Sequence, residues 1–534
     1  LVFNSGARVN TSFHTQHHGI KGLFKDRPEP TVMINSEDAA ERGIANGDKV
    51  MIKTPRGSVV QRAIVTGDIK QGCIDANHAC GSPVGPEAWK KSNINDLTDL
   101  DNYDPISGFP VYKALLCEIV KVKDDGAPLL IDSGEIRSDE IEVAEIKKSD
   151  ITIYLDNNAT TKIADEVKDQ MIELLDIYGN PSSIHGEGKQ ANQIVEQARR
   201  KVAQQLNCTA KRIIFTGSGT ESDNIAIKGV ALANKGEKNH IITSTVEHPA
   251  VLNSCRWLET QGFKISYLPV DRTGTVDLKD LEKTITDRTC LISIMLANNV
   301  TGSVQPVKEL AEIAKKRGII FHSDAVQAMG KIPVDIDELG VDLLSISGHK
   351  FYGPKGVGAL YIKKGIDLEY LIHGGGQEFG IRSATENVMG IAGFGKAMEM
   401  VPKYLKNIKK TIKLRDRLQS GIKDIVPDYI FNGNANNRLP NTLNITIPGI
   451  RGESIVLEAA KRRLCFSSGS ACHSGSSAPS YVLLAMGLTE EEAHCSLRFS
   501  LGYKTTEEEI LKSLDIIREI INDSKNIIRF VPCK

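Results

Sequence analysis

Apolar residues between position 151 and about position 400 alternate between short continuous runs and longer stretches with helical spacing. The short runs are typical of buried strands and cover 213–215, 241–243, 291–296 and 319–322. The amphipathic stretches predict helices over 165–178, 190–206, 249–261 and 307–317. Because strands that alternate with helices favour a mainly parallel sheet covered on both faces, we expect an α/β large domain over 151–400.

The pattern after position 400 is different. A helical stretch leads to a strand at 442–447 and a closing helix at 506–521, which predicts a smaller α+β domain over 401–534. Residues 123–150 are charged and weakly patterned, as in a linker.

The first 122 residues contain short β-like runs that lie close together, at 31–34, 49–54, 58–65 and 113–122. Asn46-Gly47-Asp48 and Pro55-Arg56-Gly57 are turn signals between them. We therefore expect a compact β-barrel over 1–122.

Composition sets limits on function. A chain of 534 residues is too long for one core and favours three or four domains. The net charge of −1 gives no nucleic-acid footprint, and we expect no membrane span and no secretory signal. The ten cysteines show no CxxC pair or zinc spacing, which predicts free thiols in a reducing cytoplasm.

Cys472 stands in a run of small and polar residues, 467–480, that has no large apolar side chain before position 481. Such a run predicts a mobile loop, and a thiol on a mobile polar loop is a candidate nucleophile. The alternative is an incidental cysteine in a linker.

A second candidate is Lys350, which follows the apolar run 341–346 and precedes a glycine-rich turn. A lysine at the end of a buried strand is costly unless it is paired or used covalently, as in a Schiff base with pyridoxal phosphate (PLP). The alternative is a surface lysine before a β-turn.

Further cofactor-binding features come at the ends of other predicted strands. Gly217-Ser218-Gly219-Thr220 opens a helix, where free N–H groups suit a phosphate. Asp324 ends a strand and is able to hold a pyridinium nitrogen protonated. His248 also follows a strand, where an imidazole can stack on a ring and move protons, although many histidines in such places are structural.

Together these residues resemble the NifS/IscS-type cysteine desulfurases, which are PLP enzymes of fold type I, over about residues 153–534. The resemblance is carried by Tyr154-Leu155-Asp156-Asn157-Asn158-Ala159-Thr160-Thr161, the Ser-x-His-Lys motif, the Gly-Ser-Ala-Cys loop and Leu497-Arg498-Phe499-Ser500. It implies that Lys350 bonds the cofactor, His248 stacks on its ring and Asp324 pairs with the ring nitrogen.

The same resemblance implies roles for other residues. Asn298 and Gln327 would reach the phenolic oxygen, and Asn157 and Arg498 would bind the substrate carboxylate. Thr385 would reach the phosphate of the neighbouring subunit in a homodimer. The phosphate would otherwise be held by a set of small and polar residues: Gly219, Thr220, Ser347, Gly348 and His349.

The implied activity is conversion of L-cysteine to L-alanine with a persulfide on Cys472. The sulfur would supply an iron–sulfur scaffold or another acceptor, and Cys472 would transiently ligate an iron–sulfur cluster. Three positions depart from many relatives: Phe379, Ala384 and His473. They leave open the detail of the dimer contact and whether His473 lowers the pKa of Cys472 or is a solvated loop residue.

Two other classes of function stay open from the residues. One is another PLP enzyme of this fold, such as a selenocysteine lyase or a transaminase. The other is a non-catalytic docking protein that holds a cofactor-assembly partner. Bound PLP, and alanine production from cysteine compared with selenocysteine, would separate them.

Residues 1–122 resemble the C-terminal dinucleotide-binding domain of molybdopterin oxidoreductases such as formate dehydrogenases. The matching pieces include Arg8-Val9-Asn10-Thr11, Gly43-Ile44-Ala45-Asn46-Gly47-Asp48 and Thr54-Pro55-Arg56-Gly57. The resemblance implies either a molybdopterin dinucleotide ligand or a remnant, and the fusion suggests sulfur delivery to a molybdenum cofactor. Four histidines lie in this segment without supporting metal-ligand spacing, so we predict no metal site: His14, His17, His18 and His78.

Overall fold

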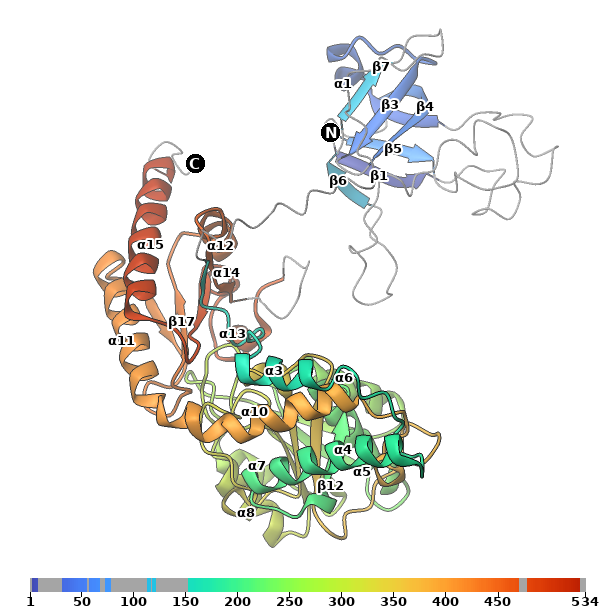
Figure 1. Cartoon of the computed structure of the whole chain (residues 1–534). Helices are drawn as coiled ribbons and strands as arrows, with labels where there is room; N and C mark the ends of the chain where they lie inside the picture. Colours follow the sequence, from blue (N-terminus) through green and yellow to red (C-terminus); the bar gives the residue numbers. More distant parts are fainter. Residues whose placement is uncertain are drawn as a thin grey trace, which may run out of the picture. The chain divides into compact units, whose positions relative to one another are not determined.

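The chain divides into two compact units, Leu1–Ile146 and Lys147–Lys534 (Figure 1). The structure is a computed structural model and describes residues 2–7, 31–54, 57–67, 73–77, 113–116, 118–121, 152–469 and 478–528. Each unit has hydrophobic clusters of its own. The predicted linker and the four histidines of the first unit lie outside the described residues.

The described strands of the first unit form one mixed seven-stranded sheet. Its order is β6 (Lys113–Leu116), β1 (Val2–Ala7), β5 (Cys73–Asn77), β2 (Thr31–Asn35), β4 (Gly57–Thr66), β3 (Lys49–Thr54) and β7 (Glu118–Lys121). Alternate residues such as Val32, Ile34, Val50 and Ile52 build the core of this unit. The short helix α1 (Ser36–Glu41) follows β2, and its first turn is capped by the side chain of Asn35.

All four runs predicted in this unit are strands, with one difference. The run 113–122 is divided into β6 and β7, which are the two ends of the strand order. β1 and β5 were not predicted, because neither has the alternation of a half-buried strand and both gain their pairing from distant strands. Closure of the sheet into a double-psi barrel stays a prediction.

A second seven-stranded sheet forms the centre of the large domain in the other unit. Its order is β11 (Lys264–Leu268), β10 (His240–Ser244), β12 (Thr289–Ser293), β13 (Ile320–Asp324), β14 (Leu343–Ser347), β15 (Gly358–Ile362) and β9 (Ile213–Thr216). The pairings from β11 to β14 are parallel, and β15 is antiparallel to both of its neighbours. The expectation of a mainly parallel sheet is therefore confirmed.

Helices cover both faces of this sheet. Ile213 and Phe215 belong to one hydrophobic cluster, whereas Ile214 between them belongs to the opposite one. One face packs against α3 (Asp165–Glu173), α4 (Gly186–Gln205), α8 (Val307–Lys316) and α10 (Val388–Lys406), and the other against α5 (Gly219–Ala233) and α6 (Pro249–Thr260) (Figure 1). Strands buried on both faces explain why the sequence shows continuous apolar runs. Shorter helices complete the domain: α7 (Leu278–Thr284) and α9 (Ile336–Leu339).

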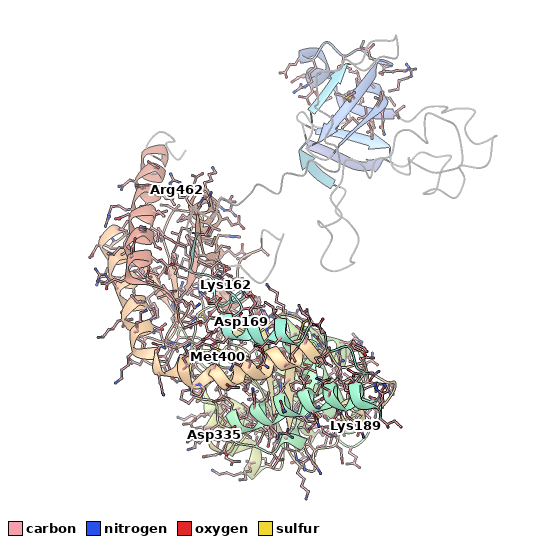
Figure 2. All side chains as sticks on the ribbon, viewed as in Figure 1. Lys162, Asp169, Lys189, Asp335, Met400 and Arg462 are labelled. Carbon is pink, nitrogen blue, oxygen red and sulfur yellow. The ribbon has the colours of Figure 1, made fainter. Side chains whose placement is uncertain are left out.

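The small domain is built on an antiparallel sheet in the order β16 (Ile430–Asn432), β17 (Thr442–Thr446), β20 (Ser496–Ser500) and β19 (Ser467–Ser468). Four further helices follow the large domain and accompany this sheet: α11 (Ile408–Ile425), α12 (Gly452–Lys461), α14 (Glu490–His494) and α15 (Glu507–Ile528). Arg462 ties α12 to α15 through Glu458 and Asp523 (Figure 2). A helix of five residues, α13 (Tyr481–Ala485), precedes α14.

The start of the second unit packs in the small domain. β8 (Ile153–Tyr154) pairs with β18 (Leu464–Cys465), and Ile153 and Leu155 lie in the core of the small domain. The chain therefore begins this unit beside the small domain, builds the large domain, and returns along α10. Residues 156–161 cross between the two and reach the site described below.

The helix expected over 165–178 ends at Glu173. Leu175 is 63% exposed and Tyr178 is 82% exposed, so no core face exists to continue the helix. The closing helix expected over 506–521 continues to Ile528, and the other predicted helices and strands of this unit lie within four residues of their expected bounds.

Among the described residues, no helix combines the length and apolarity that a bilayer crossing needs. Within the same residues, no cluster of three or more histidine, cysteine or carboxylate side chains is arranged to hold a metal ion.

Candidate active site

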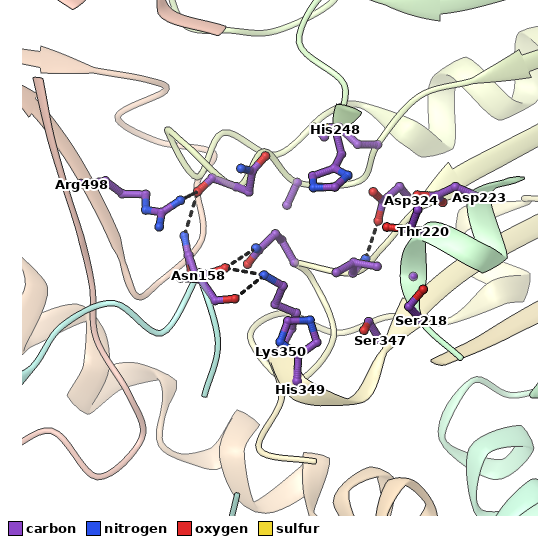
Figure 3. Close-up of a pocket in the computed structure, with 17 residues that line it drawn as sticks. Asn158, Ser218, Thr220, Asp223, His248, Asp324, Ser347, His349, Lys350 and Arg498 are labelled. Carbon is purple, nitrogen blue, oxygen red and sulfur yellow. Dashed lines mark hydrogen bonds between the residues drawn. The ribbon is translucent and has the colours of Figure 1, made fainter. Parts of the chain in front are cut away.

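A cavity of about 370 Å³ opens where the strands of the large sheet end (Figure 3). β9, β10, β13 and β14 each deliver a polar residue to it just after or at their last position. This is the edge at which open α/β sheets bind ligands. The lining residues are Asn158, Ala159, Ser218, Gly219, Thr220, Asp223, His248, Met295, Ala297, Asn299, Asp324, Val326, Gln327, Ser347, His349, Lys350 and Arg498.

One end of the cavity is the N-terminus of α5. Ser218 caps this helix by accepting a hydrogen bond from the backbone N of Glu221 at 3.1 Å. A Cβ at Gly219 would lie 2.7 Å from Cγ2 of Val326 and 3.3 Å from Cβ of Ser347, so any larger residue would force Val326 to shift. The free N–H groups and the helix dipole make this end suitable for a phosphate.

Asp324 lies at the opposite side of the cavity from Lys350 and ends β13 (Figure 3). Its Oδ1 accepts a hydrogen bond from the backbone N of Val326 at 2.8 Å. Burial raises the pKa of Asp324 to about 6, while that bond and the charge of Lys350 act in the other direction. A cationic ring nitrogen in the cavity would favour the ionised form.

A second carboxyl, Asp223, lies beside Asp324 in the cavity wall. Burial, and then the charge of Asp324, raise the pKa of Asp223 well above the usual value. Behind it, His322 contacts Ser293 at 2.8 Å and Ser345 at 2.9 Å through its two ring nitrogens. The pKa of His322 is lowered to about 3 by burial, so the ring is neutral.

His248 caps helix α6. Its Nδ1 accepts a hydrogen bond from the backbone N of Ala250 at 3.2 Å, and Pro249 takes the first helical position. Burial, and then the charge of Lys350, lower the pKa of His248 to about 4. A neutral ring whose Nδ1 accepts must carry its proton on Nε2, which is the form that can donate to a ligand in the cavity.

Lys350 closes the short 3₁₀ turn Gly348–Lys350 that follows β14. Its Nζ donates hydrogen bonds to the backbone O of Asn158 at 2.8 Å and of Ala159 at 2.7 Å. The amine is thus held at the cavity by the crossing segment 156–161. His349 next to it contacts Thr160 through Nδ1 at 3.1 Å, and its pKa is lowered to about 4 by burial first and by Lys350 second.

Arg498 brings a guanidinium from the small domain. Its Nη2 donates to Asp156 Oδ1 at 2.8 Å and to Ser467 Oγ at 3.1 Å, and its Nη1 donates to the backbone O of Asn299 at 3.2 Å. The Nε atom of Arg498 is buried without a hydrogen-bond partner among the described residues. A buried unsatisfied donor beside a cavity fits a ligand carboxylate.

Within the described part of the chain, four predicted residues are not among those that line the cavity: Asn157, Asn298, Gly348 and Thr385. Asn298 donates from Nδ2 to Val246 O at 3.0 Å and accepts at Oδ1 from the backbone N of Val300 at 2.8 Å, while its neighbour Asn299 lines the cavity. Asn157 donates to Ser500 O at 2.9 Å, and its neighbour Asn158 lines the cavity in its stead. Gly348 packs under the turn, where a Cβ would meet the ring of Phe394 at 2.8 Å.

Thr385 lies in a separate pocket of about 140 Å³, together with Gly217, Arg382 and Glu378. This segment is anchored by a buried ion pair in which Arg199 Nη1 contacts Glu378 Oε2 at 2.7 Å. Phe379 has a φ of 59° and is 54% exposed, and the guanidinium of Arg199 lies 5.1 Å from the centre of its ring. Thr385 itself is exposed rather than directed to the main cavity of its own chain.

Cys472 and His473 lie outside the described residues. The chain that leads to them is anchored at the site, because Ser467 accepts a hydrogen bond from Arg498 and Gly469 N donates to Ser496 O at 2.8 Å.

Several residues at the site were not singled out from the sequence. Asn158 and Asp223 stood inside motifs that drew attention, but nothing in one sequence says which of two neighbouring side chains faces a cavity. Lys331 carries no motif, and Glu247 stands directly before His248 without a predicted role of its own. Their only signal is a charged residue beside an apolar run, which is weak because most such residues are solvated.

The comparisons with known proteins agree with this geometry. The aminotransferase class-V family matches residues 153–512, and the molybdopterin dinucleotide-binding domain family matches residues 1–116. The cysteine desulfurase IscS of Methanosarcina thermophila is 48% identical over 382 residues, which is 71% of this chain and 94% of that protein. The IscS of Dictyoglomus turgidum is 50% identical over 377 residues, covering 70% and 96%.

Solved structures show the same relationship. A NifS-like protein that is 42% identical aligns with a TM-score of 0.66 over 70% of this chain and all of its own. A NifS-like protein from Rickettsia africae is 36% identical, with a TM-score of 0.63 over 70% of this chain and 100% of its own.

The fold and the site therefore define an aminotransferase class-V enzyme domain of the PLP fold type I. Its residues fit PLP: a glycine cradle at a helix N-terminus for the phosphate, a carboxyl for the ring nitrogen and an amine for the aldehyde. Within that class the chain belongs to the IscS/NifS cysteine desulfurases.

Proposed function

We propose that this chain is a PLP-dependent cysteine desulfurase that converts L-cysteine to L-alanine and takes the sulfur onto Cys472. The observation that carries the proposal is the cavity itself. It brings Lys350, Asp324, His248 and Arg498 together in a domain whose relatives are cysteine desulfurases. The sulfur would be passed on for iron–sulfur cluster assembly.

When bound, PLP supplies an aldehyde that reversibly bonds an amine and a ring that accepts an electron pair. The chain supplies the rest. Lys350 provides the amine and, when released, a base whose Nζ is held by the carbonyls of Asn158 and Ala159. Asp324 provides the negative charge for the ring nitrogen, and the neutral His248 carries on Nε2 a proton that it can donate.

Arg498 is proposed to bind the carboxylate of L-cysteine, and Asn298, Asn157 and Gly348 to support the surrounding loops. Arg498 is supported by its buried Nε, which lacks a partner among the described residues. The sulfur step is proposed for the Cys472 thiolate: an S–S bond forms to the substrate sulfur while the substrate C–S bond breaks. The carbon keeps the electron pair and takes a proton to become alanine.

The test is to add L-cysteine to the holoenzyme and to measure the visible spectrum, alanine and sulfide together. We expect Cys472→Ser to keep the visible band of bound PLP and to lose persulfide formation and sulfur release. Cys465→Ser is the matched control, because Cys465 is a free thiol of the same domain and is expected to leave the rate unchanged. A Cys472→Ser protein that released sulfide at the full rate would refute the nucleophile, and a preference for selenocysteine would favour a lyase.

We also propose that the first unit binds a molybdopterin dinucleotide. In this way it would bring the persulfide of Cys472 near a molybdenum-cofactor enzyme, which would accept the sulfur. The support is the family match over residues 1–116 on the same chain as the desulfurase. Equilibrium dialysis of the full chain against the dinucleotide would test binding. If the dinucleotide did not bind, the domain would be a remnant that has lost this ligand.

The active assembly is proposed to be a homodimer, in which Thr385 serves the neighbouring cavity. Its support is that Thr385 is exposed and lies in a pocket apart from the cavity of its own chain. The compartment is proposed to be the reducing cytoplasm, and the support is that five cysteines of the second unit are free thiols: Cys208, Cys255, Cys290, Cys465 and Cys495.

A further inference from the structure

Lys331 is a buried lysine next to the cavity, and the proposed reaction gives it no role. The residue is 8% exposed, and burial, followed by the charges of Lys350 and Arg498, holds its pKa well below the usual value. Buried lysines are rare unless they are paired. The hydrogen-bond acceptor of Lys331 among the described residues is the carboxamide of Gln327 rather than a carboxylate.

The contact continues to the catalytic amine. Lys331 Nζ donates to Gln327 Oε1 at 2.6 Å, and Gln327 Nε2 donates to the backbone O of Asn158 at 2.9 Å. The same oxygen accepts from Lys350 Nζ at 2.8 Å (Figure 3). Gln327 and Asn158 line the cavity, whereas Lys331 does not. Lys331 therefore contacts the site through Gln327.

These partners allow only one orientation of the Gln327 carboxamide. A carbonyl oxygen only accepts and an amide NH₂ only donates, whereas a lysine amine donates in both of its forms and accepts only when it is neutral. If the carboxamide were turned over, Oε1 would face the Asn158 oxygen, and that contact would be lost because two carbonyl oxygens cannot pair. Nε2 would then face Lys331, which could accept from it only as a neutral amine. With Oε1 on Lys331, the Nε2 group keeps a second N–H for a ligand in the cavity.

We propose that Lys331 is a positioning residue, which holds Gln327 so that its N–H rather than its C=O is presented to the phenolic oxygen of bound PLP. This inference rests on the proposed function. A donor on that oxygen stabilises its negative charge and makes the conjugated nitrogen attached to Lys350 less basic. Loss of the donor is therefore expected to raise the pH at which the visible spectrum of the resting holoenzyme changes.

The experiment is a pH titration of that spectrum for the wild type, Lys331→Met, Gln327→Leu and the double variant. Each single variant is expected to raise the midpoint by roughly one pH unit, the size of one hydrogen bond to a charged group. The double variant is expected to show no more than the larger single effect, because Lys331 acts through Gln327. Lys331→Arg, which keeps a donor, is expected to restore much of the wild-type midpoint.

Lys363→Met is the matched control, because Lys363 is a half-exposed lysine of the same domain, paired with Asp342 at 2.8 Å. It is expected to leave the midpoint unchanged. An unmoved midpoint in PLP-loaded Lys331→Met would overturn the inference. The inference would also be overturned if Lys331→Met still shifted the pH midpoint in the Gln327→Leu background. That result would assign the effect to the charge of Lys331 and not to its contact with Gln327.

If Lys331→Met does not fold, Lys331→Gln replaces it in the same set of single and double variants. The glutamine side chain is shorter, so its donor does not reach Gln327, but it leaves a polar group in the buried space. An unmoved midpoint in this variant, or a shift that persists in the Gln327→Leu background, would again overturn the inference. A wild-type protein with no visible band of bound PLP would contradict the proposed function itself, which separates that failure from a failure of the Lys331 inference.

Discussion

Burial rather than neighbouring charge sets the protonation of most side chains around the cavity. It is the largest cause of the lowered pKa values of His248 and His349 and of the raised pKa values of Asp324 and Asp223. Both histidines are thereby neutral near pH 7, and both carboxyls hold their protons to a higher pH than they would in water. A site of this kind exchanges protons with a ligand rather than with water, because each group is desolvated before the ligand arrives.

Glu247 gives the first residue-scale prediction. It is fully buried, and burial raises its pKa from 4.5 to about 8 against the hydrogen bonds from Ser244 and Met295. Between these pH values the folded protein binds a proton at Glu247 and the unfolded chain does not. The stability from this proton is complete below pH 4.5 and is lost as the pH rises through 8.

We therefore expect the unfolding free energy of the wild type, minus that of Glu247→Gln, to decrease as the pH rises between 4.5 and 8. Urea unfolding of both proteins at a series of pH values measures it. Glu282→Gln, at an exposed position, is the control and is expected to show no such trend. A difference that is constant across this range would show that Glu247 is ionised in the folded protein.

At the scale of elements, the site is a set of strand ends and helix starts. α5 begins with Ser218 as its cap, and α6 begins with His248 as its cap. A capping residue has extended backbone angles, so its side chain turns out of the helix toward the sheet edge. The same local geometry that satisfies the first N–H groups of each helix therefore directs a functional side chain to the cavity.

Gly219 and Gly186 allow a matched test of this arrangement, because each is the first residue of its helix. A Cβ at Gly219 would meet Val326 and Ser347, whereas a Cβ at Gly186 would meet nothing within 4 Å. We expect Gly219→Ala to weaken PLP binding by roughly tenfold, in line with the cost of overpacking, and Gly186→Ala to leave it unchanged. Absorbance titration of the apoproteins with PLP measures both, and equal affinities would show that the cradle tolerates a methyl group.

At the scale of the whole molecule, the two units have separate cores. The core of the first is built from β2, β3, β4 and β5, and the cores of the second from the large sheet and the small domain. Within the second unit, β8 starts the chain in the small domain and the crossing segment joins its two parts at the cavity. A core that is complete by itself does not need the other unit in order to fold.

The shortened chain Lys147–Lys534 is accordingly expected to bind PLP and to form alanine from L-cysteine at the rate of the full chain. Parallel assays of alanine, bound PLP and thermal unfolding measure this. The Cys472→Ser version of the shortened chain is the control for sulfur release by other routes. A folded shortened protein with little activity would show that the first unit takes part in the reaction.

The predictable part of this protein was its large domain and the residue types at its strand ends. The continuous apolar runs predicted strands buried on both faces, and the motifs around Lys350 and Asp324 predicted which ends carry chemistry. The structure brings both residues, with His248, Gly219, Thr220, Ser347, His349, Gln327 and Arg498, to one cavity. β1 and β5 were not predictable, because their pairing depends on strands far away in the sequence.

The choice between neighbours also lay beyond the sequence. Asn157 and Asn158, or Asn298 and Asn299, are the same residue type one position apart, and only the course of the backbone decides which lines the cavity. The linkage from Lys331 through Gln327 to Asn158 joins segments more than 160 residues apart. Local pattern fixes periodicity and residue chemistry by itself, because both are properties of adjacent residues. Tertiary packing alone decides which side chains become buried together, and with that their protonation and their partners.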